Sequence, residues 1–139
     1  MSGILGGAGS RSGVIGETEI DYEEGTWTPV ISGITTTVTK ATYTKIGNTV
    51  FIRAWITAGG TGTTDTITGL PYLSGSDNTS ASAALLNAVD WGAGTAPMAR
   101  ILNSSQIITL RTATDNAGAN AVFNWVSGEF VMLGIQYNI

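Results

Sequence analysis

The chain has 139 residues, enough for one domain with one hydrophobic core, and it contains neither cysteine nor histidine. These absences exclude disulfides, thiolate and ordinary zinc sites, and Ser-His-Asp catalysis, so we expect no cofactor. The net charge is -4 and the 6 lysines and arginines form no cluster along the sequence, so we expect no nucleic-acid partner.

Glycine and neutral polar residues dominate the composition. Only 12% of the residues are charged, whereas 19 are glycine, a balance typical of β-strands and loops. No apolar run approaches about 18 residues, and no Lys/Arg-led apolar segment opens the chain. We therefore expect neither a signal peptide nor insertion into a membrane.

Residues 1–20 alternate glycine with single apolar side chains, which predicts an extended arm rather than a core element. One interpretation is a flexible leader. The other, which we favour, is an assembly arm that binds a partner protein or trimer mates. Its expected contact residues are Ile4, Leu5, Arg11, Val14 and Ile15.

An acidic run follows, made of Glu17, Glu19, Asp21, Glu23 and Glu24. Such a run is usually a solvated segment, and we favour that interpretation. Carboxylates at every second position of an extended chain point the same way, so a Ca²⁺ site shared around a three-fold axis stays open. Contact with a basic patch on a host protein is a further alternative.

A β-hairpin is predicted over Thr36–Ile46 and Thr49–Ala58, joined at Gly47-Asn48. Side chains alternate along a strand, so one face of the second strand belongs in a core. The other face carries Phe51 and Trp55, which must be covered by a second sheet of this chain or by a neighbouring subunit. These two aromatic residues are candidate subunit-interface residues.

Further strands are predicted in chain order at Trp27–Ile31, Asp65–Thr68, Pro97–Leu102, Gln106–Thr112, Asn120–Trp125 and Glu129–Ile139. Ser80–Trp91 suits a short helix or a strand, and we favour a strand. The last strand is predicted to be central, with Ile139 on its apolar face. The pattern predicts an all-β fold: an antiparallel β-sandwich of jelly-roll type over residues 21–139, preceded by the 1–20 arm.

Three short motifs occur in order: Tyr22 to Pro29, Tyr43 to Asn48, and Gly69 to Tyr72. Together they resemble the C-terminal domain of tail-fibre and related virion proteins of tailed bacteriophages, and the Gly-rich opening is similar to the segment that often precedes that domain. The resemblance implies a homotrimeric, non-enzymatic, β-rich virion part. The chain begins at Met1 without room for a fibre shaft, so we favour a capsid or collar decoration, with a fibre head as the other form of this surface module.

Catalysis would have to use two carboxylates, as in glycosidases. The candidates each lie in or beside a predicted turn, where such groups normally bond to the local backbone, so we expect no enzyme. They are Asp65, Asp77, Asp90, Asp115 and Glu129. Tyr72 and Trp91 lie near loops and are candidate glycan contacts, whereas Trp55 and Trp125 are expected in the core or a subunit interface.

These observations predict a phage virion structural protein, made in the host cytoplasm and located on the virion surface. It would form a homotrimer and bind other virion proteins through residues 1–20. The alternative is a tail-associated receptor-binding adhesin that recognises a host surface glycan or protein.

Overall fold

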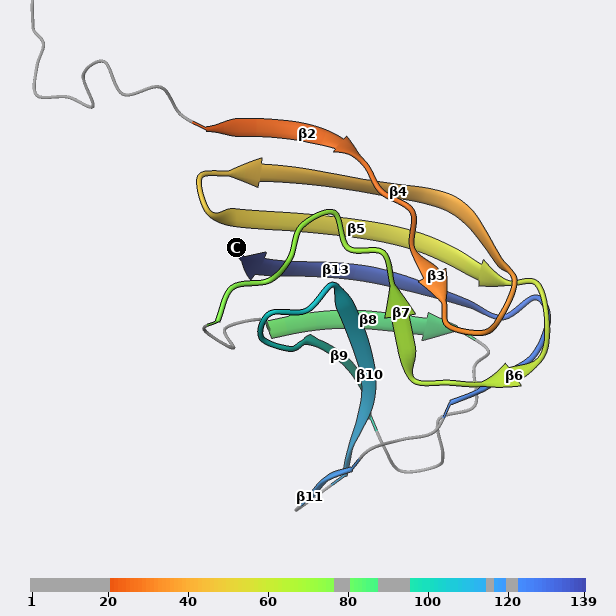
Figure 1. Cartoon of the computed structure of the whole chain (residues 1–139). Coiled ribbons are helices and arrows are strands. Elements are labelled where there is room, and N and C mark those ends of the chain that lie inside the picture. The colour runs from red at the N-terminus through yellow and green to blue at the C-terminus, as the bar shows by residue number, and fades with distance from the viewer. Residues whose placement is uncertain (1–20, 77–80, 88–95, 115–116, 120–122) are drawn as a thin grey trace, which may run out of the picture.

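The computed structural model describes residues 21–76, 81–87, 96–114, 117–119 and 123–139. Within these ranges every regular element is a β-strand, and all strand pairs are antiparallel, as predicted (Figure 1). The first five-stranded sheet has the order β2 (Tyr22–Thr26), β4 (Thr36–Ile46), β5 (Thr49–Ala58), β13 (Phe130–Asn138), β8 (Ala81–Asn87).

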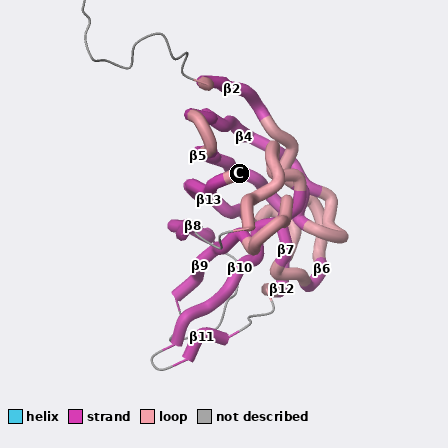
Figure 2. Tube along the Cα trace, turned by 60° about the vertical axis from the view of Figure 1, so that its left-hand side comes forward, coloured by secondary structure: helices cyan, strands magenta, loops and turns pink. Residues whose placement is uncertain are grey.

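The second five-stranded sheet contains β11 (Ala117–Ala119), β10 (Ile107–Thr114), β7 (Thr66–Thr68) and β3 (Val30–Ile31), with β9 (Ala96–Ile101) paired to β10. A small sheet joins β6 (Gly62–Thr63) to β12 (Asn124–Trp125). Strands β7 and β10 lie across one face of the first sheet (Figures 1 and 2). The fold is a β-sandwich, whereas the jelly-roll connectivity stays a prediction.

The core lies between the two sheets and is built by alternation. On β5, Val50, Ile52 and Ile56 are buried while their neighbours are exposed or half-buried. They form one cluster with apolar side chains of the second sheet and of β13: Ile31, Ile67, Ile101, Ile108, Leu110, Val131, Leu133 and Ile135. Each such side chain contributes about 1.5–3 kcal/mol on burial, so a one-residue slip of β5 would be strongly disfavoured.

The hairpin prediction is confirmed, because β4 and β5 have the expected bounds and pair from Ile46↔Thr49 onward. Gly47 has a φ of 59°, the positive value that the tight turn requires at its first position. The prediction of a central last strand is also confirmed, since β13 pairs with both β5 and β8. Within Ser80–Trp91, the structure confirms a strand over Ala81–Asn87.

Three expectations were wrong in detail. Trp27–Ile31 is not one strand, because the chain leaves the first sheet after β2 and enters the second at β3, and the Trp27 indole is buried at this crossing. No strand was predicted between Ala58 and Asp65, but β6 lies there and pairs with β12. Ile139 does not continue the buried face: it is 38% exposed, because the chain end follows Asn48 rather than the second sheet.

Gly69 opens the motif Gly69 to Tyr72, and its backbone requires glycine for two separate reasons. Its φ is +97°, and an added Cβ would lie 2.2 Å from the Thr28 carbonyl oxygen. Gly128 has a φ of +98° but nothing within 4 Å of its Cβ position. The two glycines therefore differ in steric contact and not in φ.

We expect Gly69→Ala to lower the free energy of unfolding by about 2 kcal/mol more than Gly128→Ala, because only the first substitution adds a steric clash. Urea denaturation followed by tryptophan fluorescence measures both. Equal losses in the two variants would contradict the close approach of Gly69 to Thr28.

Candidate functional site

The outer face of the first sheet is the side directed away from the second sheet. Phe51 and Trp55 lie on it and are 41% and 40% exposed. The second sheet covers the opposite face, so it does not cover these two residues. The sequence predicted that either a second sheet of this chain or a neighbouring subunit covers these two residues. The described part of this chain supplies no such sheet.

Further apolar side chains extend this face. Trp55 contacts Phe130 with ring centroids 5.7 Å apart. At the other end of the face, Tyr22 pairs in register with Ile46. Ile46 is two residues from Thr44, which pairs with Phe51, so Ile46 and Phe51 lie on the same face. Tyr22 is 55% exposed and Ile46 is 45% exposed. A patch of exposed large apolar side chains is typical of an interaction surface.

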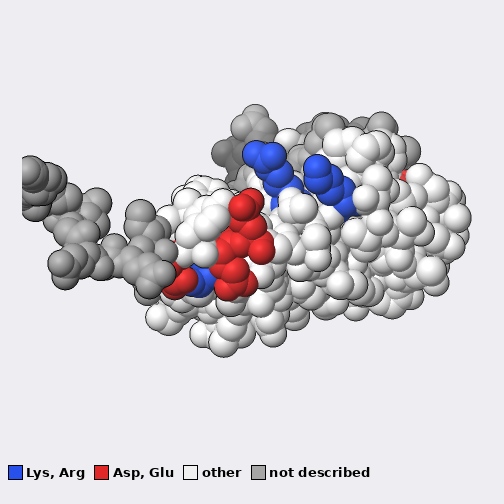
Figure 3. Space-filling model, turned by 90° about the horizontal axis from the view of Figure 1, so that it is seen from above, with Lys and Arg blue, Asp and Glu red and all other residues white. Residues whose placement is uncertain are grey.

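A groove of about 900 Å³ crosses this outer face over β2, β4, β5 and β13. Its lining combines the Phe51 ring with charged and amide side chains of both signs, namely Glu24, Lys40, Arg53 and Gln136. Gly134 pairs with Arg53 and leaves the sheet bare at this point, since a Cβ there would meet nothing within 4 Å. Acidic side chains gather over the β2 edge with basic ones beside them (Figure 3).

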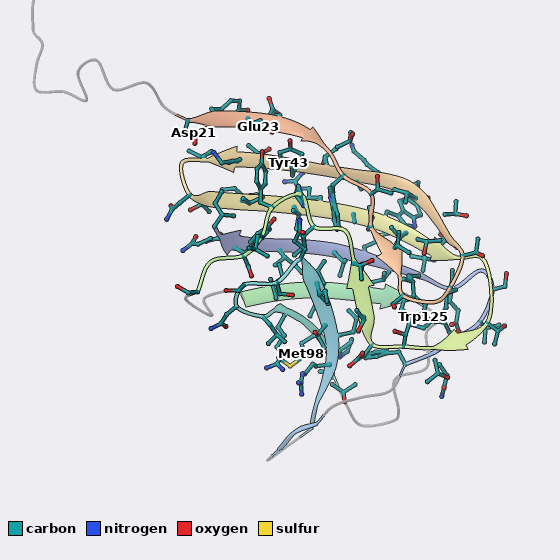
Figure 4. All side chains as sticks on the ribbon, viewed as in Figure 1. Asp21, Glu23, Tyr43, Met98 and Trp125 are labelled. Atoms are coloured by element: carbon teal, nitrogen blue, oxygen red, sulfur yellow. The ribbon has the colours of Figure 1, made fainter. Side chains whose placement is uncertain are left out.

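A second cluster, which we call the tyrosine cluster, lies on the inner side of β2 and β4 and consists of Glu23, Tyr43, Tyr72 and Lys45 (Figure 4). Both tyrosine hydroxyls donate to Glu23 Oε1, that of Tyr72 at 2.5 Å. The rings meet edge to face with centroids 5.6 Å apart. Lys45 is buried, pairs with Asp21, and its Nζ lies 6.0 Å from the Tyr72 ring centroid.

The tyrosine cluster has a structural function. The two hydroxyl donors lower the pKa of Glu23, and the same carboxylate raises the pKa of Tyr72. The Tyr137 hydroxyl accepts from the Tyr72 amide at 3.2 Å and donates to its carbonyl at 3.1 Å, and burial raises the pKa of Tyr137 to about 12. These bonds hold the segment around Tyr72 against the sheet; its role as a glycan contact stays a prediction.

The acidic run divides among different partners. Asp21 pairs with Lys45, Glu23 accepts from two tyrosines, and Glu24 lines the groove on the opposite face. Among the described residues no three His, Cys, Asp or Glu side chains come close enough to hold a metal. Glu17 and Glu19 lie outside the described residues.

The two described carboxylates that were weighed for catalysis bond locally. Asp65 accepts from the Thr66 hydroxyl at 2.9 Å, and Glu129 accepts from the Val126 amide at 2.6 Å. The Trp125 side chain is fully buried, as expected for a core residue. Outside the described residues lie Asp77, Asp90, Asp115, Trp91 and the expected arm contacts Ile4, Leu5, Arg11, Val14 and Ile15.

Sequence reasoning missed the groove, because its lining comes from four strands whose registers are set by pairing. Alternation along β5 predicted the outward position of Phe51, but it did not predict that Gln136 of β13 lies opposite Phe51 with Gly134 two residues away. It also missed that Arg100 and Arg111 come together on β9 and β10. The detectable signal was their alternation with residues that the structure buries: Ala99 and Ile101 flank Arg100, and Leu110 and Thr112 flank Arg111.

The described residues form an all-β antiparallel sandwich. No protein-family model and no curated protein sequence matches the chain. A similar fold is present in the crystal structure of the Dettilon tailspike protein, with a TM-score of 0.57 and 15% sequence identity. The match covers 86% of this chain and 24% of that one, so the chain corresponds to about a quarter of the tailspike's length.

At this identity the likeness establishes a shared fold. The portion of the chain that the structure describes contains no helix with the length and apolar character of a membrane span.

Glu23→Gln tests the tyrosine cluster through its pH dependence. The folded pKa of Glu23 lies below the ordinary value of 4.5, so ionisation stabilises the fold fully above that pH, and this contribution is lost as pH falls through the folded pKa. We expect the melting temperature of the unaltered chain to exceed that of Glu23→Gln near neutral pH, with the difference shrinking below about pH 4.

Glu24→Gln is the matched control, because it removes a neighbouring carboxylate on the other face and leaves Tyr43 and Tyr72 in place. Thermal melts by circular dichroism at several pH values measure the effect. A difference between the chain and Glu23→Gln that does not change with pH would contradict the proposed ionised contact.

Proposed function

We propose that this chain is a bacteriophage virion structural protein, associated with the tail and located on the virion surface. The observation that carries the proposal is the fold shared with part of a tailspike protein over 86% of this chain. The exposed aromatic outer face supports it, because a surface module needs a contact area for its neighbours. The proposed role is non-enzymatic; cleavage of host polysaccharide by the purified chain would contradict that part.

The outer face of the first sheet is proposed to bury itself against another copy of the chain in a homotrimer. Phe51 and Trp55 are the proposed interface residues. The face also carries Glu24 beside Lys40 and Arg53, so two copies can offer opposite charges to one another. The groove above Gly134 has room for a side chain of the neighbouring copy.

The alternative is a tail-associated adhesin that binds a host surface glycan. The groove supports it, because an aromatic ring beside carboxylate, guanidinium and amide groups is a lining that can stack on a sugar and bond its hydroxyls. A neighbouring copy of the chain and a host glycan would occupy the same surface. A trimer that buries the outer face would close the groove to a glycan, whereas a monomer would leave the groove open.

Changing Phe51 and Trp55 together to serine tests the trimer. We expect light scattering at micromolar concentration to give a trimer mass for the unaltered chain and a monomer mass for the variant, because the apolar centre of the interface is removed. Leu73→Ser is the control, since Leu73 is 56% exposed but lies outside this face. A monomer mass for the unaltered chain would contradict the trimer.

Deleting residues 1–20 tests attachment to the particle through the assembly arm. We expect the truncated chain to fold, as shown by an unchanged melting temperature, and to be absent from purified virions by quantitative mass spectrometry, because the arm is the proposed anchor. Retention of the truncated chain on virions would contradict the anchor. The copy number also bears on location, since a tail position with closed symmetry permits only small multiples.

A further inference from the structure

Arg100 and Arg111 are brought together on the outer face of the second sheet. Arg100 pairs in register with Thr109, and Arg111 pairs with Met98, so the two arginines are diagonal neighbours on adjacent strands. Diagonal neighbours have Cβ atoms within about 7–8 Å. Their alternate neighbours Ala99 and Leu110 are buried, which places both arginines on the side away from the core. We call them the arginine pair.

Neither guanidinium has a carboxylate partner among the described residues. The Nε atoms of Arg100 and Arg111 are shielded from water and make no hydrogen bond. Strands β3, β7, β9 and β10 contain no Asp or Glu. In Figure 4, Met98 lies far from Asp21 and Glu23, so the acidic β2 edge is not beside the arginine pair.

Among the described residues, nothing balances the charge of the arginine pair. Two like charges on adjacent strands disfavour one another, and a buried N–H without an acceptor costs about 1–3 kcal/mol. An anion placed between the guanidinium groups relieves both costs. The planar fork of arginine matches a carboxylate with two parallel hydrogen bonds, which a lysine cannot provide.

The neighbours of the arginine pair indicate what carries the anion. Met98 is 43% exposed and Ile107 is 38% exposed, and Thr109 pairs in register with Arg100. A sugar acid has the matching groups: a carboxylate, an apolar face of C–H groups, and hydroxyls. We propose that the arginine pair binds the carboxylate of an acidic sugar unit, such as a uronic acid within a surface polysaccharide.

A nucleic acid fits this surface poorly. Its affinity depends on several phosphate contacts along the backbone, whereas the net charge of this chain is -4 and the arginine pair supplies two cationic groups. The proposal adds a ligand class to the chain and does not depend on where the chain sits in a virion. Failure of this binding would leave the trimer and virion tests unaffected.

The test is titration of the ¹⁵N-labelled protein with an oligogalacturonate, observed through the arginine Nε–H signals by NMR. We expect the Arg100 and Arg111 signals to shift, and Arg100→Gln or Arg111→Gln to weaken binding by about tenfold or more, as loss of a charged hydrogen bond implies. Val126→Ser is the control, because Val126 is 53% exposed and lies outside both the arginine pair and the groove. Arg111→Lys keeps the charge without the fork and should also weaken binding.

Three further probes decide the class of ligand. A neutral galactose oligomer should leave the signals unmoved, which supports the role of the carboxylate. Equal binding of inorganic phosphate or sulfate would overturn the sugar component and indicate a simple anion site. Tighter binding of a peptide with the sequence of residues 15–26, or no shift with oligogalacturonate, would overturn the proposal.

Discussion

This structure depends on one constraint: the central pair of strands, β5 and β13, has one buried face and one exposed face. These strands pair along the whole of β13. The buried side chains come from the even-numbered positions of β5 and the odd-numbered positions of β13. The second sheet covers that one face. Because side chains alternate, the same register that buries Ile52 and Ile135 sends Phe51 and Gln136 outward. The exposed aromatic outer face is thus a geometric consequence of the core.

The edge of the first sheet is held by polar rather than apolar contacts. Strand β2 is an edge strand, and its acidic side chains disfavour pairing with another edge. On its inner side, Glu23 joins Tyr43 of β4 to Tyr72, whose backbone is bound to Tyr137 of β13. Gly25 permits this arrangement, because a Cβ there would lie 2.7 Å from the Tyr43 ring. An edge strand, a loop and a central strand are therefore fixed by one network.

The sequence predicts those features of the fold that depend on alternation within a strand and on the residues of a turn. The β4 to β5 hairpin follows from Gly47-Asn48 and from alternating apolar residues, and both are local features. Only Val30 and Ile31 of the predicted strand Trp27–Ile31 lie in a sheet. The chain crosses between the two sheets where Trp27 is buried, and that burial is a tertiary contact. The groove and the arginine pair depend on registers between strands that are distant in sequence or separated by a turn. Alternation within one strand cannot supply those registers, so these surfaces were not predicted.

The outer faces of the two sheets carry different kinds of side chain. The face with Phe51 and Trp55 offers aromatic area and charges of both signs, so a copy of the same surface can complement it. The face with Arg100 and Arg111 offers only positive charge among the described strands, so two copies of it would repel one another. The proposed homotrimer therefore uses the first sheet, and the outer face of the second sheet is left for the proposed anionic ligand.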